Sequence, residues 1–90
     1  MRFEWDPAKA KRNLRKHRIS FEEACSVFYD PLAITGDDPD HSIAEERMIT
    51  FGVSSANRLL VVAHTERNDT IRIISAGIAT SHERKIYEEG

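Results

Sequence analysis

Apolar residues form two runs in the second half of the chain, with a short polar stretch between them. Leu59–Thr65 is apolar on both faces of an extended chain, which is typical of a central strand of a sheet. Asn68-Asp69 has the chemistry of a tight turn, and Ile71–Ala76 forms the second run. The pattern predicts two paired strands joined by a short turn, a β-hairpin.

The start of the chain predicts a strand followed by a helix. Met1–Trp5 alternates apolar and polar residues with the two-residue period of a strand. Asp6 suits the N-cap and Pro7 the first position of a helix, which we expect to end near His17. Such a helix has a thin apolar face, made of Ala10, Leu14 and His17. A thin apolar face indicates a helix that is largely exposed or is covered by a partner.

A second, shorter helix follows a capping box. Ser20 and Glu23 have the spacing in which the serine and glutamate side chains cap each other's backbone N–H groups. The core-facing side of this helix is expected to carry Phe21, Ala24, Cys25 and Phe28, and Asp30-Pro31 ends it. Cys25 is interpreted as a small buried hydrophobe, because no basic residue occupies a helical neighbour position that would activate the thiol.

The remaining pattern completes one α+β domain over residues 1–90. Leu32–Thr35 and Arg47–Val53 are predicted strands, the latter with Ile49, Phe51 and Val53 on one face. Thr80-Ser81-His82-Glu83 is a capping box that opens a last helix through Tyr87. The predicted order is β-α-α-β-β-β-β-α, an antiparallel meander sheet with helices packed on one face.

Composition narrows the classes of protein to which the chain can belong. Its 90 residues are 40 % hydrophobic and include one cysteine, which supports one core and no internal disulfide. No run approaches the roughly 20 apolar residues of a membrane span, and no secretory signal opens the chain. We therefore expect a cytoplasmic location and no membrane contact.

Charge is distributed unevenly, although the net charge is only −2. One stretch is basic and holds no acid; it contains Lys9, Lys11, Arg12, Arg15, Lys16 and Arg18. A mildly acidic protein can carry such a basic face and use it to bind a phosphate backbone or a partner. The same residues can also form an ordinary solvated helix face, so both interpretations stay open.

A carboxylate-rich segment, Gly36–Ser42, contains His41 and invites interpretation as a metal site. Its spacing matches no metal-binding loop, and Asp and Pro are common turn residues, so we expect a turn. The four histidines, at positions 17, 41, 64 and 82, are scattered. The sequence predicts neither a metal nor another cofactor.

The hairpin carries polar residues that pairing of its strands does not require. His64, Glu66 and Arg67 come where the first strand ends, and Arg72 and Ser75 lie in the second. RNA cleavage through the ribose 2′-hydroxyl needs a base, an acid and a cation near the reacting phosphate, and these residue types can supply them. The alternatives are that His64 is a core residue and that the arginines pair with nearby carboxylates.

Three segments resemble the BrnT toxins. They are FEWDPAKAKRNLRKHRISFEEA at Phe3–Ala24, EERMITFG at Glu45–Gly52, and HTERNDTIRIISAGIATSHERKIYEE at His64–Glu89. The similarity extends over nearly the whole chain, in order and with similar spacing. The opening motif, FEWD followed by N-L-x-K-H and SFEEA, is specific to that family.

The resemblance implies a RelE-like ribonuclease of a type II toxin–antitoxin pair, which cleaves RNA in the bacterial cytoplasm and slows translation. Because the histidines are scattered, we expect its catalysis to be metal-independent. It also implies a BrnA-type antitoxin that forms a hetero-oligomer with the toxin and alone contacts operator DNA. The alternative is a non-catalytic module that only binds an antitoxin or nucleic acid.

The resemblance also assigns polar positions, at Lys16, His17, Glu45, Arg47, His64, Glu66, Arg67, Arg72 and Ser75. We expect the catalytic residues to be His64, Glu66, Arg67, Arg72 and Ser75. We expect RNA or the antitoxin to bind Lys9, Arg12, Lys16, His17 and Arg47.

One position departs from the family pattern. Family members commonly read Ile-Ser-Ala-Arg where this chain reads Ile74-Ser75-Ala76-Gly77. The strand period predicts that Gly77 shares a face with Ile71, Ile73 and Ser75. Either this copy is attenuated, or the residue was changed so that the toxin could be expressed, or another cation substitutes for the arginine.

Overall fold

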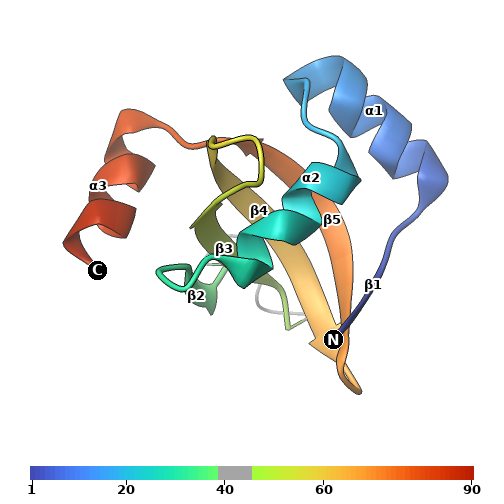
Figure 1. Cartoon of the computed structure of the whole chain (residues 1–90). Helices are drawn as coiled ribbons and strands as arrows, with labels where there is room; N and C mark the ends of the chain where they lie inside the picture. The colour runs from blue at the N-terminus through green and yellow to red at the C-terminus, as the bar shows by residue number, and fades with distance from the viewer. Residues whose placement is uncertain (39–45) are drawn as a thin grey trace.

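A computed structural model of the chain, which describes residues 1–38 and 46–90, shows an α+β fold with a five-stranded sheet (Figure 1). The elements are β1 (Arg2–Glu4), α1 (Pro7–His17), α2 (Phe21–Ser26), the 3-10 helix η1 (Val27–Tyr29), β2 (Ile34–Asp37), β3 (Met48–Val53), β4 (Leu59–Arg67), β5 (Thr70–Ile78) and α3 (Ser81–Glu89). The predicted order of elements is confirmed. None of these helices is long and apolar enough to span a bilayer.

The sheet has the strand order β1-β5-β4-β3-β2. Strands β2 to β5 form the predicted antiparallel meander. β1 pairs in parallel with β5, with Phe3 opposite Ile71, so the complete sheet is mixed rather than antiparallel. Hydrophobic alternation identifies a strand but carries no information about its partner or direction, which is why the sequence did not predict this pairing.

One face of the sheet is covered by α1, α2 and η1 and holds the core. In Figure 1, α2 crosses in front of β4 and β5. Phe21 of α2 is fully buried, and its ring lies 5.9 Å from that of Trp5 in an edge-to-face arrangement. Leu60 and Ile73 from the sheet are also fully buried beneath the helices. We call this the helix-covered face and the opposite side the open face.

The hairpin of β4 and β5 contains an irregularity that sequence periodicity does not show. Ala63 pairs with Ser75 and His64 with Ile73, so Ile74 is an extra residue in β5. The bulge reverses the side on which the following residues lie, because it shifts the two-residue period by one. Gly77, opposite Val61, therefore lies on the open face, and the prediction that it shares a face with Ile71 and Ile73 is wrong.

The turn of the hairpin is the predicted one. Asn68 and Asp69 have φ values of 52° and 66°. Two successive residues in the left-handed region form the turn whose twist matches that of paired strands, and Asn and Asp tolerate this region better than most residues. The local sequence thus determines where β4 ends and β5 begins.

Helix α1 lies beside β5, where β1 no longer continues, and is held there by Asn13. The Asn13 side chain accepts a hydrogen bond from Ala76 N at 3.0 Å and donates to Ala76 O at 2.8 Å and Ile19 O at 3.0 Å. It thereby satisfies backbone groups of β5 that a neighbouring strand would otherwise bind. Asn13, which is not part of the thin apolar face, is buried, whereas Leu14 of that face is 50 % exposed.

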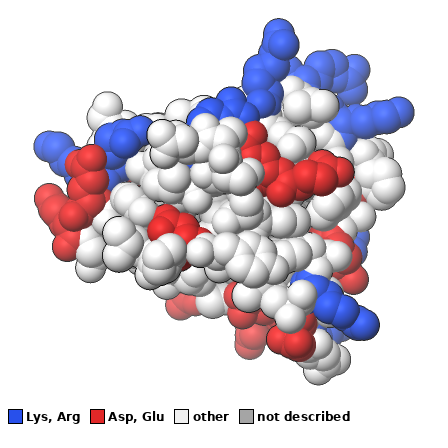
Figure 2. Space-filling view, viewed as in Figure 1, with Lys and Arg blue, Asp and Glu red and all other residues white. Residues whose placement is uncertain are grey.

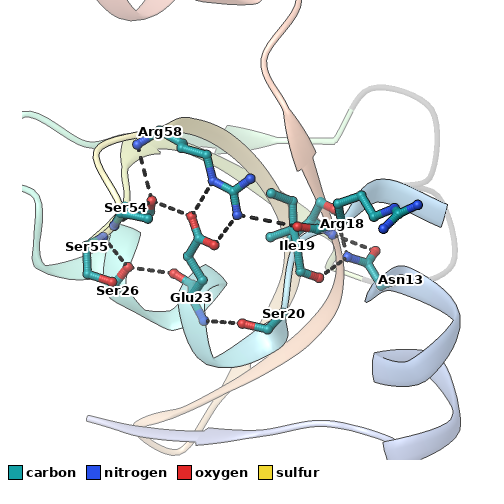
Figure 3. A network of polar contacts seen from close by, with 11 residues as sticks. Asn13, Arg18, Ile19, Ser20, Glu23, Ser26, Ser54, Ser55 and Arg58 are labelled. Carbon is teal, nitrogen blue, oxygen red and sulfur yellow. Dashed lines mark hydrogen bonds and ion pairs between the residues drawn. The ribbon is translucent and has the colours of Figure 1, made fainter. Parts of the chain in front are cut away.

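Helix α2 is joined to the β3–β4 turn by a polar network, shown in Figure 3. Ser20 caps the helix by accepting from Glu23 N at 3.0 Å, as predicted. The Glu23 carboxylate does not complete the capping box. It binds the Arg58 guanidinium and accepts from Ser54 Oγ at 2.6 Å. The hydrogen bonds from Arg58 hold the pKa of Glu23 below its usual range.

Helix α3 begins with a complete capping box between Thr80 and Glu83, as predicted. Near its end, Tyr87 donates a hydrogen bond to Asp30 Oδ2 at 2.6 Å. The same carboxylate oxygen accepts from Val53 N at 2.8 Å. These contacts tie α3 to the end of β3 and to the loop that follows η1.

Candidate functional site

An open groove of about 710 Å³ lies on the open face of the sheet, near the end of the hairpin. Four cationic side chains line it: Arg2, Lys9, Arg67 and Arg72. Three carboxylates line it as well: Glu4, Glu46 and Glu66. The groove is thus a polar surface that carries charges of both signs, with one cation more than carboxylates.

Strand pairing explains how these side chains come together. Arg2 is opposite Thr70 and Glu4 is opposite Arg72, and Arg72 is in turn opposite Thr65. Side chains of paired residues point to the same face of a sheet. Three strands from both ends of the sequence therefore contribute to the groove, and Lys9 joins them from α1.

Arg72 and Glu4 form an ion pair across the groove floor, with Nη1 and Oε2 2.9 Å apart. Their side chains are 49 % and 53 % exposed. Exposed pairs contribute only about 0–1 kcal/mol to stability, so a phosphate entering the groove can compete for the guanidinium at little cost. Arg67, exposed at the end of β4, lines the same groove.

His64 lies on the other side of the sheet. It is fully buried in the helix-covered face, and the Phe28 ring lies against it at 4.9 Å. Its Nε2 atom shares a hydrogen bond with Thr50 Oγ1 at 2.7 Å, and Thr50 shares another with Thr35. Burial lowers the pKa of His64 to about 4, so the imidazole is neutral at pH 7. These observations favour the core alternative for His64 over a catalytic role.

Glu66 lies at the boundary between the two faces. Its Oε1 atom is 3.8 Å from Nδ1 of His64, and it also lines the groove. Ser75, opposite Ala63, is half-buried on the open face and does not line the groove. Of the five residues expected to be catalytic, the structure thus brings Glu66, Arg67 and Arg72 to the groove, and not His64 or Ser75.

The outer side of α1 forms a second, shallower hollow of about 880 Å³, lined by Lys11, Leu14, Arg15 and Arg18. Figure 2 shows lysine and arginine side chains gathered over this helix. Arg12 and Lys16 are exposed on the same helix. The basic run in the sequence is therefore a continuous basic surface in the structure.

The other expected binding residues lie elsewhere. His17 is exposed at the end of α1, next to Gly77: a Cβ atom at position 77 would lie 3.7 Å from His17 Nδ1, an ordinary contact distance. Arg47 is half-buried just before β3. Glu45 and His41 fall outside the described residues, as does most of the segment considered as a metal loop.

Two further sequence interpretations concern Cys25 and metal binding. Cys25 packs against the core, and burial raises the pKa of its thiol to about 11, which agrees with the interpretation as a hydrophobe. Within residues 1–38 and 46–90, no three histidine, cysteine or carboxylate side chains come together as a set of metal ligands.

Arg2 and Glu4 are groove residues that sequence reasoning did not select. Their signal is the alternation of Met1–Trp5, which turns Phe3 towards the core and the two charged residues to the opposite face. That alternation predicts a strand, but it does not show that this strand lies beside β5. The contribution of the first residues to the groove follows only from the parallel pairing.

A mixed sheet with one face covered by helices, and a groove lined by four cations and three carboxylates on the other, defines a small α+β protein. The model of one protein family, ribonuclease toxin, BrnT, of type II toxin–antitoxin systems, matches residues 5–83. The chain belongs to this family, which pairs a ribonuclease toxin with an antitoxin.

The fold is also that of a solved member of the family. The chain is similar to the 1.1 Å crystal structure of the Brucella abortus ribonuclease toxin BrnT, with a TM-score of 0.65 and 21 % sequence identity. The similarity covers 90 % of this chain and 99 % of that one. No curated protein sequence matches the chain.

Proposed function

We propose that this chain cleaves RNA in the groove of the open face and thereby inhibits translation. The observation that supports the proposal most directly is the gathering of Arg2, Lys9, Arg67 and Arg72 in one open groove. Several cations on one open surface attract a polyanion and fix its backbone. The family supplies the ribonuclease class, and the groove supplies a place for the substrate.

The proposed reaction is attack of a ribose 2′-oxygen on the neighbouring phosphorus. Negative charge develops on the equatorial oxygens of the phosphorane, and Arg67 and Arg72 are positioned to stabilise it. One preorganised cation or donor of this kind contributes about 10²–10³-fold in rate. This chemistry requires no metal ion, so we propose that the endoribonuclease is metal-independent and uses no other cofactor.

The direct test is incubation of the purified chain with single-stranded RNA in excess EDTA. We expect cleavage to continue and to leave 2′,3′-cyclic or 3′-phosphate ends. An RNA with 2′-deoxyribose at the cleaved position should resist. Loss of cleavage on chelation, with recovery in magnesium, would contradict the mechanism. Absence of cleavage under all conditions would favour the alternative, a module that only binds an antitoxin or nucleic acid.

We further propose that the partner is a BrnA-type antitoxin, which forms a hetero-oligomer with this chain in the bacterial cytoplasm and alone contacts operator DNA. The basic α1 surface, including Lys9, Arg12 and Lys16, and the groove are the surfaces proposed for it. Arg47, half-buried before β3, and His17, exposed at the end of α1, are proposed contacts for RNA or the antitoxin. The RelE-like relationship remains a prediction of the resemblance.

The antitoxin proposal is tested by co-purification of the toxin with the product of the neighbouring gene. Charge reversal of Lys9, Arg12 and Lys16 to Glu should weaken the complex if α1 is the docking surface. Reversal of Arg67 and Arg72 should weaken it if the groove is. Unchanged binding in both sets would contradict the proposal. Induction of the toxin with and without that gene tests inhibition of growth.

Finally, we propose that Gly77 attenuates this copy of the toxin. It lies on the open face, as Arg72 does, and a Cβ atom at this position would meet only His17, at an ordinary contact distance. Gly77→Arg should therefore fold and raise RNA cleavage by about 10²–10³-fold, the contribution of one added cation near the phosphate. Equal toxicity of the two forms would show that the arginine is not needed here.

A further inference from the structure

We propose that Glu4 is the general base of the reaction and that Arg72 holds it in position. This inference rests on the proposed ribonuclease function and assigns a role that neither the sequence pattern nor the family description provides. A base is needed because the ribose 2′-hydroxyl must lose its proton as it attacks. The question is which side chain of the groove can accept that proton.

No histidine among the described residues that line the groove is available for this role. His64 is fully buried on the helix-covered face, with its Nε2 atom engaged by Thr50. A proton acceptor must lie within hydrogen-bond reach of the reacting hydroxyl, and His64 does not line the groove. The bases that the groove offers are carboxylates.

Three carboxylates line the groove, and their positions differ. Glu66 lies at the rim, where its Oε1 atom is 3.8 Å from Nδ1 of His64. Glu46 precedes β3 at the margin of the groove. Glu4 lies on the edge strand β1, in register with Arg72, which is in register with Thr65 of β4. It accepts a charge-assisted hydrogen bond from Nη1 of Arg72, an arginine of the groove, at 2.9 Å.

The contact with Arg72 serves the proposed role in two ways. It fixes the carboxylate next to the guanidinium that a phosphate would also contact, so base and phosphate are brought to one place. It is also an exposed pair of low stability, about 0–1 kcal/mol, so the guanidinium can turn towards the phosphorane as charge develops there. Positioning a base next to its target contributes to rate because the reacting atoms need not be brought together from solution.

In the proposed step, proton transfers accompany the formation and the breaking of bonds to phosphorus. The Glu4 carboxylate takes the 2′-hydroxyl proton while the 2′-oxygen forms a bond to phosphorus. The bond from phosphorus to the 5′-oxygen breaks, and the leaving oxygen takes a proton from water in the open groove. The products are a 2′,3′-cyclic phosphate and a 5′-hydroxyl. Glu4 then returns its proton to the hydroxide left in solvent.

The surroundings of Glu4 are mainly cationic. The charged groups that share the groove with it are Arg72 of β5, Arg67 and Glu66 of β4, Lys9 of α1, Arg2 of its own strand, and Glu46. Four of these six are positive, which favours negative charge developing on the substrate.

The test compares Glu4→Gln with the wild type on a short single-stranded RNA. We expect kcat to fall by about 10²–10⁴-fold, the usual contribution of a general base, with KM changed little. Glutamine keeps an oxygen that can accept from Arg72, so a loss would not come from the broken pair alone. The residual activity should also lack the rise with pH that deprotonation of a base produces in the wild type.

Glu88→Gln on α3 is the matched control, because it removes an exposed carboxylate that does not line the groove. It should retain activity within several-fold, and Glu4→Asp should retain part of it. If Glu4→Gln is slower but keeps the wild-type pH profile, Glu4 only positions Arg72 and the inference is overturned. Equal cleavage by the two proteins overturns it as well. If the wild type cleaves no RNA, the proposed function itself fails.

Discussion

The two faces of the sheet give residues of the same strand different environments. On β4, His64 points to the helix-covered face and is fully buried, whereas Thr65 and Arg67 point to the open face and line the groove. Neighbouring residues of the chain are thus separated by the thickness of the sheet. Closeness in sequence placed His64, Glu66 and Arg67 in one candidate site, but alternation of side chains divides that set between two environments.

The polar residues of the two faces also differ in burial and in hydrogen bonding. On the helix-covered face, polar groups such as Asn13, Thr50 and His64 are buried and hydrogen-bonded, so their loss should affect folding. On the open face, charged groups are exposed and weakly paired. Their loss should therefore lower RNA cleavage and leave the free energy of unfolding nearly unchanged. The predictions below test this division.

The largest effect is expected from Arg72→Ala. It should lower RNA cleavage by about 10²–10³-fold, because one cation near the phosphorane is lost, while the melting temperature changes little. Arg67→Ala should act in the same direction, by about 10²-fold. Arg84→Ala on α3 is the control, because it removes an exposed arginine away from the groove. A variant at Arg72 or Arg67 that unfolds would show that the arginine has a structural role.

The next largest effect is the loss of stability at low pH that the buried His64 causes. Its pKa is about 4 in the folded protein and 6.5 as an ordinary value, so the unfolded chain binds the proton more tightly. The stability that His64 contributes as a neutral group is complete above pH 6.5 and is lost as pH falls towards 4. The difference amounts to about 3 kcal/mol by linkage.

This dependence is measured by urea unfolding of the wild type and His64→Leu between pH 7 and pH 4. The variant should show the smaller decrease, because it cannot bind the proton on unfolding. His82→Gln, at an exposed histidine on α3, is the control and should follow the wild type. Parallel pH curves for the wild type and His64→Leu would contradict the neutral, buried state of His64.

A somewhat smaller effect is expected from Asn13→Ala. The change leaves Ala76 N and O without their partner, so the free energy of unfolding should fall by about 2 kcal/mol. Lys11→Ala, exposed on the same helix, is the control. A secondary loss of RNA cleavage is expected, because α1 also carries Lys9 into the groove. Unchanged stability of Asn13→Ala would mean that α1 is held mainly by its other contacts.

The smallest effect is expected from Glu66→Gln, which tests the boundary between the faces. Glu66 is half-exposed and His64 is neutral, so the contact between them is not an ion pair at pH 7. The free energy of unfolding should change by less than about 1 kcal/mol, measured by urea unfolding. A large loss of RNA cleavage with full stability would instead support the sequence-based expectation that Glu66 is catalytic.

The sequence predicted the structure correctly where a few neighbouring residues determine it. Asp6-Pro7, Ser20 and Thr80 begin helices because their side chains or ring geometry satisfy the first turn, and Asn68-Asp69 makes the hairpin turn because both residues tolerate positive φ. These are interactions over two or three residues. They explain why the order of elements and most of their bounds were predictable.

The site was less predictable, because it depends on which distant segments meet. Arg67 and Arg72 flank one turn, and their proximity followed from the hairpin alone. Glu4 and Arg2 reach the groove only because β1 pairs in parallel with β5, and no local pattern indicates that pairing. Glu23 has the spacing of a capping box, yet its carboxylate binds Arg58 from the β3–β4 turn, which is 35 residues away.

The sequence by itself therefore determined the elements, their order, the basic character of α1 and the hairpin with its two arginines. The tertiary structure decided the partner of β1, the bulge at Ile74 that moves Gly77 to the open face, and the burial of Asn13 and His64. Local structure follows from hydrogen bonds and torsional preferences within a few residues. The face on which a side chain lies follows from strand pairing and packing between distant segments, which only the folded chain brings together.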